Sequence, residues 1–435
     1  MARKVFISIL GTGFYTKCKY VTDNFVSSNT RFAQQSILEL CDTKDWNKED
    51  TALFFLTDRA KELNWTSKER YNSISKETCK YTGLKHIIHD MNLPVETKGI
   101  FIPDGKDENE MWDIFTIIFN QLQDGDEVYI DLTHSFRYLP MLLLVLSNYA
   151  KFLKNIKIKH LSYGNFEARN QETNEAPIIN LLPITALQDW TFAAADYLEN
   201  GNTERLVNLS STQLEPILRE AKGTNKDAIL INNFIKKLQE TTEDFQTCRG
   251  LNIINASNIN TLKSQLEELE STFIKPLDPV IKKISNSFEV FDKEQNVQNG
   301  FNAAKWCLEN GLYQQSVTIL QENVVSYFCK KHQIDVANED EREIVNSVFF
   351  IIIYKIINNE DYWSKVAKKY KDKVYILLDD STLNNKDIIN SFSRLTELRN
   401  DINHAGMRSK KKPLSVNQIK EKIQNEMEII TSTLN

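Results

Sequence analysis

The spacing of apolar residues divides the chain into a first part with two periodicities and a second part that is helical. In the first part, helical spacing covers Glu110–Leu122 and about Leu139–Leu153. Strands that alternate with helices predict a Rossmann-like α/β domain with a mainly parallel sheet covered on both faces. The last two expected strands are joined by a polar stretch that allows a hairpin. The apolar runs typical of buried strands are Val5–Leu10, Ala52–Thr57, Gly99–Ile102, Glu127–Leu132, Ile158–Tyr163 and Ile178–Leu182.

From Thr185 onward, apolar residues recur at helical spacing, as in Leu395, Leu398 and Ile402. Only 13 glycines among 435 residues also favour long helices with few tight turns. We therefore expect three regions: an α/β domain over residues 1–184, an all-α connector over 185–299 and an all-α domain over 300–435.

Composition narrows the class of protein. With 41% hydrophobic and 26% charged residues, the chain has the balance of a soluble globular protein. No run of 18 apolar residues predicts a membrane span, and the N-terminus lacks the pattern of a signal peptide. Six scattered cysteines without a CxxC pair fit free thiols in the cytoplasm. The net charge of −6 gives no support for broad nucleic-acid binding, and no stable DNA partner is expected, but a local basic groove is compatible with it.

The segment Arg399–Gly406, with the sequence RNDINHAG, is the main catalytic candidate. If the preceding helix continues through it, Asn400 and His404 lie four residues apart on one face, with Arg399 at its edge. An arginine fork, an amide and an imidazole then surround one small volume. The alternative interpretation is structural: His404 caps the C-terminus of a helix that ends near Gly406.

These groups match the chemistry of RNA cleavage. The 2′-hydroxyl attacks the adjacent phosphate when a base removes its proton and an acid protonates the leaving oxygen. Histidine is suited to this proton transfer near neutral pH, and arginine stabilises the extra charge on the phosphorane-like transition state. Because the nucleophile belongs to the substrate, this reaction needs no metal ion.

The same segment resembles the R-N-x-x-x-H motif of HEPN ribonucleases. The run Trp306–Glu322 also resembles the first core helix of the HEPN domain in CRISPR-associated ancillary nucleases of the Csx/Csm type, so that the likeness covers about Gly300–Asn435. The resemblance implies metal-independent cleavage of single-stranded RNA, with 2′,3′-cyclic phosphate ends expected from 2′-hydroxyl attack. It also implies a homodimer in which two arginine–histidine motifs face each other.

A basic run follows the motif. Its cationic members are suited to guiding an RNA backbone. The alternative is a solvated loop that Pro413 ends. The proposed RNA-binding residues are Arg408, Lys410, Lys411 and Lys412.

Two loops of the α/β domain are candidates for a ligand site. Gly11-Thr12-Gly13 follows the first strand, which suggests phosphate contact, but the third glycine of a dinucleotide fingerprint is replaced by Thr16, and the chain has no P-loop. After the fourth expected strand comes the segment Asp131–Arg137, DLTHSFR. In a parallel sheet such loops gather at the carboxyl ends of the strands. The members of this segment suited to phosphate or base are Thr133, His134, Ser135 and Arg137, whereas Asp131 is interpreted as a helix or turn cap.

The D-x-T-H-x-x-R segment and the Gly-Thr-Gly loop resemble the CARF domain of the same ancillary nucleases, over about Met1–Pro183. A CARF domain followed by a HEPN domain implies a type III CRISPR effector that a cyclic oligoadenylate activates allosterically. Cyclic tetra-adenylate is the favoured activator, and cyclic hexa-adenylate is the alternative. The loop residues matched by this resemblance are Gly11, Thr12, Gly13, Phe14, Thr133, His134 and Arg137.

Other interpretations stay open at this stage. One is a non-catalytic nucleotide sensor that controls a partner, with Arg399 and His404 purely structural, and another is a Rossmann-type enzyme for a small molecule. His86 and His89 precede Asp90 without an evident fourth ligand, so no metal site and no catalytic cofactor are expected. Five aromatic residues could stack bases, although their spacing among Ile and Val favours core packing. These are Tyr354, Tyr362, Trp363, Tyr370 and Tyr375.

Overall fold

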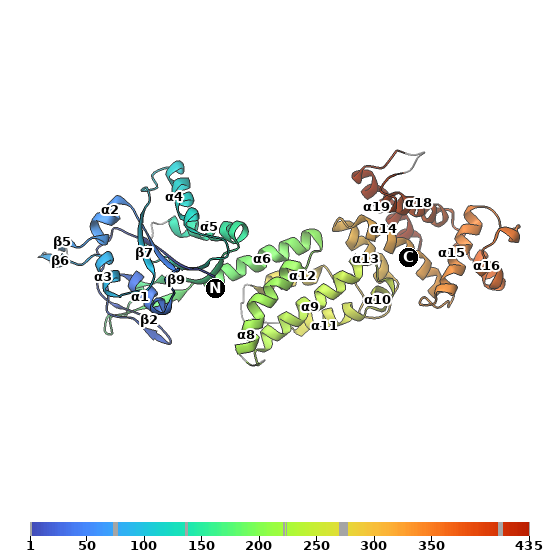
Figure 1. Cartoon of the computed structure of the whole chain (residues 1–435). Helices are drawn as coiled ribbons and strands as arrows, with labels where there is room; N and C mark the ends of the chain where they lie inside the picture. The colour runs from blue at the N-terminus through green and yellow to red at the C-terminus, as the bar shows by residue number, and fades with distance from the viewer. Residues whose placement is uncertain are drawn as a thin grey trace. The chain divides into compact units, whose positions relative to one another are not determined.

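The computed structural model of the chain describes residues 2–72, 77–134, 138–220, 222, 224–268, 277–407 and 412–434. It contains two compact units, Met1–Ala186 and Leu187–Asn435 (Figure 1). The first is an α/β unit and the second is built from helices.

The α/β unit is organised around an eight-stranded sheet with the order β3-β2-β10-β9-β8-β1-β4-β7. The five strands from β9 to β7 are parallel, and β10 pairs with β9 in the antiparallel sense. This confirms the expected α/β class and the hairpin. The strands are β1 Lys4–Leu10, β2 Lys19–Thr22, β3 Phe25–Val26, β4 Thr51–Leu56, β7 Glu96–Phe101, β8 Glu127–Asp131, β9 Lys157–Gly164 and β10 Glu175–Asn180.

Alternation along β1 explains why both faces of the sheet are covered. Val5, Ile7 and Ile9 belong to one core cluster with residues of α4 (Glu108–Gln121) and α5 (Leu139–Lys154). Phe6 and Leu10 belong to the opposite cluster. Successive side chains of a strand point to opposite faces, so a strand buried on both sides reads as a continuous apolar run. The opposite face is covered by α1 Ala33–Leu40 and α3 Leu84–Asp90.

Some short strands have no counterpart among the predicted elements. The hairpin of β5 (Lys68–Asn72) and β6 (Glu77–Tyr81) forms a separate two-stranded sheet, and β2 and β3 extend one edge of the main sheet. These strands have two to five residues and no long apolar run, so the pattern that identifies buried strands does not reach them.

The second unit has one hydrophobic core that runs from Trp190 to Leu434. Residues of the expected connector and of the C-terminal region share this core, and the boundary near residue 299 stays a prediction. None of the helices in the described part of the chain is long and apolar enough to cross a bilayer. The longer helices are α6 Leu182–Asn200, α9 Lys226–Gln246, α11 Ser257–Glu268, α13 Gln298–Glu309, α14 Tyr313–Lys331, α15 Glu339–Ile353, α18 Lys386–Asn403 and α19 Val416–Leu434.

Helix α18, which carries the catalytic candidates, is held from several sides. Gln321 of α14 donates a hydrogen bond from Nε2 to Thr396 Oγ1 at 2.7 Å. The ring of Phe392 stacks on Phe349 of α15, with centroids 3.9 Å apart. Asn385 accepts a hydrogen bond from the backbone N–H of Asp387 and thereby caps the start of the helix. The helix that carries the catalytic candidates is therefore held in place by α14 and α15.

Candidate functional site

The sheet has a topological switch point between β1 and β8. Strand β1 lies between β4 and β8, and the chain adds β4 and β7 on one side of β1 before β8 forms on the other. Because β1 and β8 are parallel, the loops that follow them leave the same edge of the sheet. Such switch points are the usual ligand sites of open α/β sheets.

Asp131 organises the loop after β8. Its carboxylate is buried and accepts hydrogen bonds from Ser8 Oγ at 2.8 Å, from the N–H of Thr133 at 2.9 Å and from Thr133 Oγ1 at 2.5 Å. Burial raises the pKa of Asp131, and the hydrogen bonds from Thr133 and Ser8 oppose that rise. The interpretation of Asp131 as a turn cap therefore holds, and its role is to fix Thr133.

Two further contacts fix the loops. Thr133 Oγ1 accepts a hydrogen bond from the N–H of Gly164, the last residue of β9, at 2.8 Å. Asn64 is fully buried and donates from Nδ2 to the carbonyls of Gly11 at 2.8 Å and Gly13 at 2.9 Å. These hydrogen bonds fix the loops after β1 and β8 to the rest of the α/β unit.

The loops after β1 and β8 touch through an aromatic stack. The rings of Tyr15 and His134 are stacked, with centroids 3.9 Å apart. A Cβ at Gly11 would lie 2.5 Å from Tyr15 Oη and 2.6 Å from the carbonyl oxygen of His134, so this close approach requires glycine. Burial lowers the pKa of His134 to about 3, and its Nε2 has no hydrogen-bond partner among the described residues.

The structure brings together most of the predicted ligand residues. Gly11 is buried, Gly13 is exposed, and the ring of Phe14 lies 5.3 Å from that of Tyr81. Thr12 and Thr133 are partly exposed, and so is His134 as a whole residue, although its Nε2 is buried. Ser135 and Arg137 lie outside the described residues.

The end of α18 differs from the expected continuous helix. The helix stops at Asn403 and His404 is its C-cap, which confirms the alternative interpretation of a helix that ends near Gly406. The N–H of His404 still donates to the carbonyl of Asn400 at 3.1 Å, so the two residues remain one helical turn apart. The N–H of Ala405 donates to the carbonyl of Ile402 at 3.0 Å, and that of Gly406 to the carbonyl of Asp401 at 2.8 Å. With positive φ at Ala405 and Gly406, these bonds form a Schellman motif, which satisfies carbonyls that a straight helix would leave free.

Of the motif residues, Arg399 has a side-chain partner among the described residues, whereas the side chain of His404 has none. The imidazole of His404 is exposed and makes no hydrogen bond or ion pair with the described residues, and Asn400 is partly exposed. Arg399 is anchored: its Nη1 donates to Oε1 of Glu322 on α14 at 3.1 Å. The motif therefore combines a fixed cation with an exposed titratable group at one helix end.

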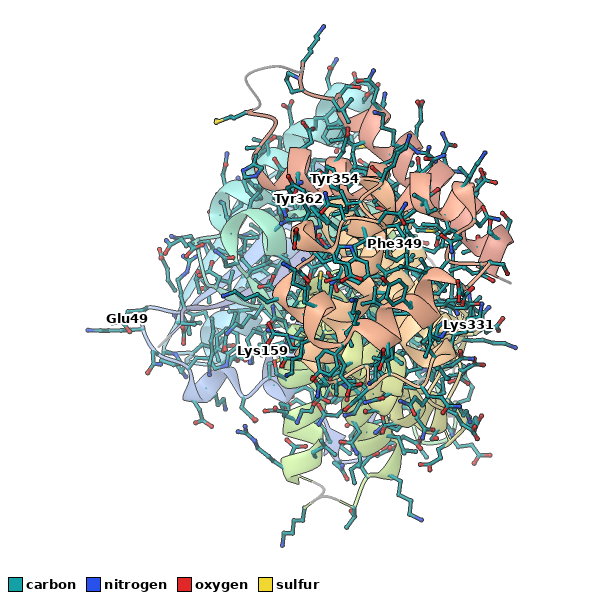
Figure 2. All side chains as sticks on the ribbon, turned by 90° about the vertical axis from the view of Figure 1, so that its right-hand side faces the viewer. Glu49, Lys159, Lys331, Phe349, Tyr354 and Tyr362 are labelled. Carbon is teal, nitrogen blue, oxygen red and sulfur yellow. The ribbon has the colours of Figure 1, made fainter. Side chains whose placement is uncertain are left out.

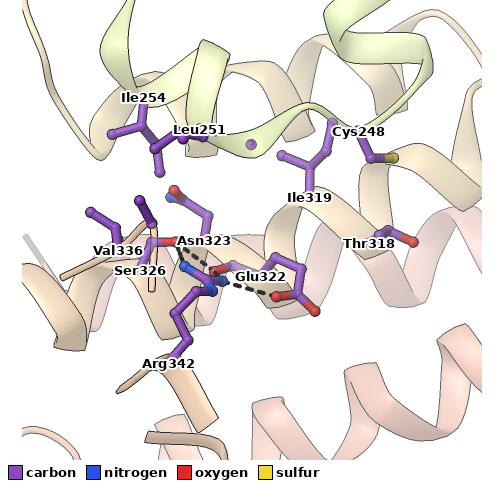
Figure 3. A pocket seen from close by; sticks show the side chains of 13 residues that line it. Cys248, Leu251, Ile254, Thr318, Ile319, Glu322, Asn323, Ser326, Val336 and Arg342 are labelled. Atoms are coloured by element: carbon purple, nitrogen blue, oxygen red, sulfur yellow. Dashed lines mark hydrogen bonds and ion pairs between the residues drawn. The ribbon is translucent and has the colours of Figure 1, made fainter. Parts of the chain in front are cut away.

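Glu322 also binds a second arginine, as Figure 3 shows. Arg342 of α15 donates from Nη2 to Glu322 Oε2 at 2.9 Å and from Nη1 to Ser326 Oγ at 2.8 Å. Two guanidinium groups thus share one carboxylate, which leaves a net positive charge. Each guanidinium has five N–H donors, so Arg399 keeps donors for a phosphate.

Two adjoining pockets flank Glu322 and Arg399. The first has a volume of about 250 Å³ and is lined by Glu322, Asn323 and Arg342 together with apolar residues such as Leu251 (Figure 3). The second has a volume of about 330 Å³ and includes Arg399. The two pockets share the lining residues Cys248 and Thr318.

Of the predicted RNA-binding residues, Lys412 is exposed, and Arg408, Lys410 and Lys411 lie outside the described residues. A Cβ at Gly406 would lie 2.8 Å from the Cβ of Pro413, so Pro413 lies beside the end of α18.

The two histidines that closely precede Asp90, His86 and His89, lie on α3. His86 and His89 are exposed and lie 3.7 Å and 3.5 Å from the carboxylate of Asp90. No group of three His, Cys, Asp or Glu side chains in this part of the chain is placed to hold a metal ion.

The residues that sequence reasoning missed are partners rather than motif members. Asn64, Tyr15 and Arg342 stood in no recognised pattern. Glu322 closed the run that resembled a HEPN core helix, but its spacing from Arg399 gave no sign of their contact. Pairing across 77 residues depends on helix packing, which a linear motif does not encode.

A parallel sheet with polar loops at its switch point places the N-terminal unit in the Rossmann-like class of ligand-binding domains. Residues 5–167 match the family model described as "CRISPR system endoribonuclease Csx1, CARF domain". This match covers most of the N-terminal unit and confirms the predicted resemblance of that unit to a CARF domain.

One curated protein and one solved structure align with more of the chain. The chain is 26% identical over 349 residues to the CRISPR-associated protein MJ1674 of Methanocaldococcus jannaschii; the match covers 79% of this chain and 47% of that protein. The chain thus spans about half the length of this curated relative. Among solved structures, Enterococcus italicus Csm6 bound to cyclic hexa-2'-fluoro-hexa-dAMP aligns over 100% of this chain and 94% of its own, with 13% identity and a TM-score of 0.45.

Proposed function

We propose that the chain is an endoribonuclease of type III CRISPR defence that a cyclic oligoadenylate activates and that cleaves single-stranded RNA without a metal ion. The observation that carries this proposal is the Arg399–Glu322 pair at 3.1 Å, beside a pocket, on the helix that ends at the exposed His404. The CARF family of residues 5–167 supports the link to CRISPR. Residues 300–435 of the helical unit would then form a HEPN nuclease domain, and residues 185–299 would form a helical connector.

The chemistry follows from the exposed and the anchored groups. His404 would remove the proton from the RNA 2′-hydroxyl or protonate the leaving 5′-oxygen, a role suited to an imidazole in contact with solvent. Arg399, held by Glu322, would stabilise the charge of the phosphorane-like transition state, and Asn400 would hydrogen-bond the phosphate. The products would carry a 2′,3′-cyclic phosphate and a free 5′-hydroxyl.

A homodimer would supply a second arginine–histidine motif, and α5 offers a surface for it. One face of α5 is buried in the core, yet apolar residues also follow one another on the opposite face. A helix that is apolar all round is normally buried, and large exposed apolar patches mark interfaces. The outward residues are Met141, Val145, Tyr149 and Phe152, which are 71%, 61%, 47% and 82% exposed.

A symmetric ligand would bind such a dimer on its two-fold axis, with each subunit contributing the same loops. Loop 11–14 and the described residues Thr133 and His134 lie at the switch point. There the ligand's phosphates would meet backbone amides, and Arg137 would add a cation. Ligand would activate because it binds the cleavage-competent state more tightly than the resting state.

One experiment tests the whole proposal. Purified protein is incubated with labelled single-stranded RNA, with cyclic tetra-adenylate, cyclic hexa-adenylate or neither, in the presence and absence of a chelator. We expect cleavage that depends on one ring size, is unaffected by the chelator and leaves cyclic phosphate ends. Ligand binding without cleavage would favour the non-catalytic sensor instead, and strict dependence on a divalent metal would overturn the mechanism.

A further inference from the structure

The far end of the helical unit exposes aromatic rings that sequence reasoning assigned to the core. Tyr354, Tyr362 and Tyr375 are 64%, 69% and 43% exposed, so the expectation of core packing is wrong for these three. It is right for Trp363, which is 4% exposed, and Tyr370 is partly buried against the core. Figure 2 looks onto this end of the unit and labels Tyr354 and Tyr362.

Local geometry explains why these rings point outward. Helix α15 ends in a Schellman motif, in which the N–H of Lys355 donates to Ile352 and that of Ile356 to Ile351, both at 3.1 Å. Lys355 has a φ of 56°, so the chain turns sharply and leaves Tyr354 and Lys355 at the tip. The ring of Tyr354 is supported from one side by Phe350, at a centroid distance of 4.4 Å.

Trp363 anchors the following loop to the rest of the unit. Its Nε1 donates to the carbonyl of Ile356 at 3.1 Å, and its ring lies 5.5 Å from that of Tyr375 on α17 (Lys371–Leu378). Tyr375 also donates from Oη to Glu360 Oε1 at 2.6 Å. Because Trp363 points inward, the adjacent Tyr362 is held outward, and the loop and α17 form one surface.

The same surface is basic although the chain as a whole has a net charge of −6. Between residues 354 and 376 there are six lysines against three carboxylates. Lys371 pairs with Glu360 and Lys373 with Glu341. The other four make no ion pair with a carboxylate among the described residues: Lys355 and, on α16 (Lys365–Lys369), Lys365, Lys368 and Lys369.

We infer that these tyrosines and unpaired lysines form a second contact surface for single-stranded RNA, separate from the cleavage site. We call it the tyrosine–lysine surface: Tyr354, Lys355, Tyr362, Lys365, Lys368, Lys369 and Tyr375. Exposed aromatic rings stack on unpaired bases of any sequence, and lysines attract the phosphates between them. The inference rests on RNA being the substrate.

The tyrosine–lysine surface is positioned to contact only an RNA that is long enough to extend beyond the cleavage site. Phe349 of α15 packs on Phe392, and Arg399 lies seven residues further along α18, which is about 10 Å at the rise of an α-helix. The tyrosine–lysine surface begins at Tyr354, which follows Phe349 at the C-terminal end of α15. Arg342, which shares the carboxylate of Glu322 with Arg399, lies twelve residues before Tyr354 on α15, about 18 Å along the helix. A dinucleotide at Arg399 would therefore not reach the surface, whereas an RNA of about twenty nucleotides would.

The test uses the full chain with His404→Ala, so that bound RNA is not cut. Affinity for labelled single-stranded RNA of both lengths is measured by fluorescence anisotropy over a range of salt concentrations. Tyr362→Ala and Tyr354→Ala are each expected to weaken binding of the long RNA roughly tenfold, since one stacked base contributes about that factor. Tyr362→Phe keeps the ring and should bind like the parent.

The lysines are tested in the same assay. Lys355→Gln with Lys365→Gln should flatten the salt dependence of binding, because fewer counterions are released. Controls are Tyr71→Ala, which removes a tyrosine 62% exposed on the α/β unit, and Lys48→Gln, which removes a lysine whose side chain is 85% exposed there. Neither control should change RNA affinity, and no variant should change binding of the short RNA.

Two outcomes would overturn the inference. One is unchanged affinity of the tyrosine variants for long RNA. The other is that these variants change the oligomeric mass but not RNA affinity, which would make the surface a protein contact. Failure of the proposed function looks different: the wild-type chain would not cleave either RNA, whatever the tyrosine variants do to binding.

Discussion

Arg399 Nη1 lies 3.1 Å from Glu322 Oε1, and the other carboxylate oxygen of Glu322 binds Arg342. The guanidinium of Arg399, which would bind the RNA phosphate, is thus oriented by the carboxylate of Glu322 on the neighbouring helix α14. Glu322 does not need to contact RNA in this arrangement. We regard it as a positioning residue for Arg399.

Glu322→Ala should lower the single-turnover cleavage rate about tenfold, because the guanidinium of Arg399 loses the carboxylate that orients it. Glu322→Gln keeps a hydrogen-bond acceptor and should recover part of the rate. The Michaelis constant should change less than kcat, since orientation matters most in the transition state. A Glu322→Ala protein that cleaves as fast as the wild type would show that Arg399 needs no positioning.

His404→Ala should reduce cleavage by about 10²–10⁴-fold, the usual contribution of a general acid or base. The melting temperature should not change, because backbone hydrogen bonds close the turn and the ring has no partner among the described residues. Rate and melting temperature are measured on the same preparation.

His332→Ala is the matched control for His404→Ala. His332 Nε2 lies 2.6 Å from Oδ2 of Asp380. Burial alone would raise the pKa of Asp380, but hydrogen bonds from Lys331, His332 and the backbone lower it to about 2. This variant should lose stability and keep its cleavage rate. The reverse pattern in the two histidine variants would mean that His404 is the structural residue.

Val145→Glu should convert the proposed dimer to a monomer, because it places a charge in the apolar stripe of α5. Cleavage should fall with it if two motifs are needed for one site. Mass is measured by analytical ultracentrifugation. Val26→Glu is the control, since Val26 is 59% exposed and Val145 is 61% exposed. If Val145→Glu remains a dimer, the contact between subunits lies elsewhere.

The stability of the N-terminal unit should fall below pH 6.5 because of His134. Burial lowers the pKa of this imidazole to about 3, whereas in the unfolded chain it binds a proton near pH 6.5. The unfolded state then holds more protons between these values, so the contribution is complete above pH 6.5 and is lost progressively as the pH falls toward 3. One such group changes the free energy of unfolding by up to ~1.4 kcal/mol per pH unit.

His134→Phe should reduce the pH slope of stability by about one proton. Urea unfolding at pH 7 and at pH 5 measures that slope. Burial also lowers the pKa of His160, which leaves a slope of the same sign in the variant. An identical slope in wild type and variant would mean that His134 is protonated in the folded state.

The sequence predicted the elements that single-segment patterns can encode. The buried strand at Val5–Leu10, for example, is β1 almost to the residue, because two-sided burial produces a continuous apolar run. The end of α18 was one of two open interpretations, and the glycine at position 406 pointed to it. The positive φ of Ala405 could not be predicted, because this conformation is favoured by glycine and not by alanine. The contacts of Asn64 with Gly11 and Gly13 and of Glu322 with Arg399 could not be predicted, because each spans more than 50 residues and depends on how elements pack.

Substitutions of Asn64 and Arg137 should weaken ligand binding, whereas substitution of His404 should impair RNA cleavage. Asn64→Ala leaves the carbonyls of Gly11 and Gly13 without their buried donor, so the loop would have to be ordered by the ligand itself. We expect the concentration of cyclic oligoadenylate needed for half-maximal activation to rise about tenfold, with unchanged basal cleavage. Arg137→Ala should act in the same direction by removing a cation for phosphate. His404→Ala should bind the same ligand normally and fail to cut. Ligand titration by calorimetry, paired with RNA cleavage, separates these effects; loss of ligand binding in His404→Ala, or normal activation of both Asn64→Ala and Arg137→Ala, would refute this division of roles.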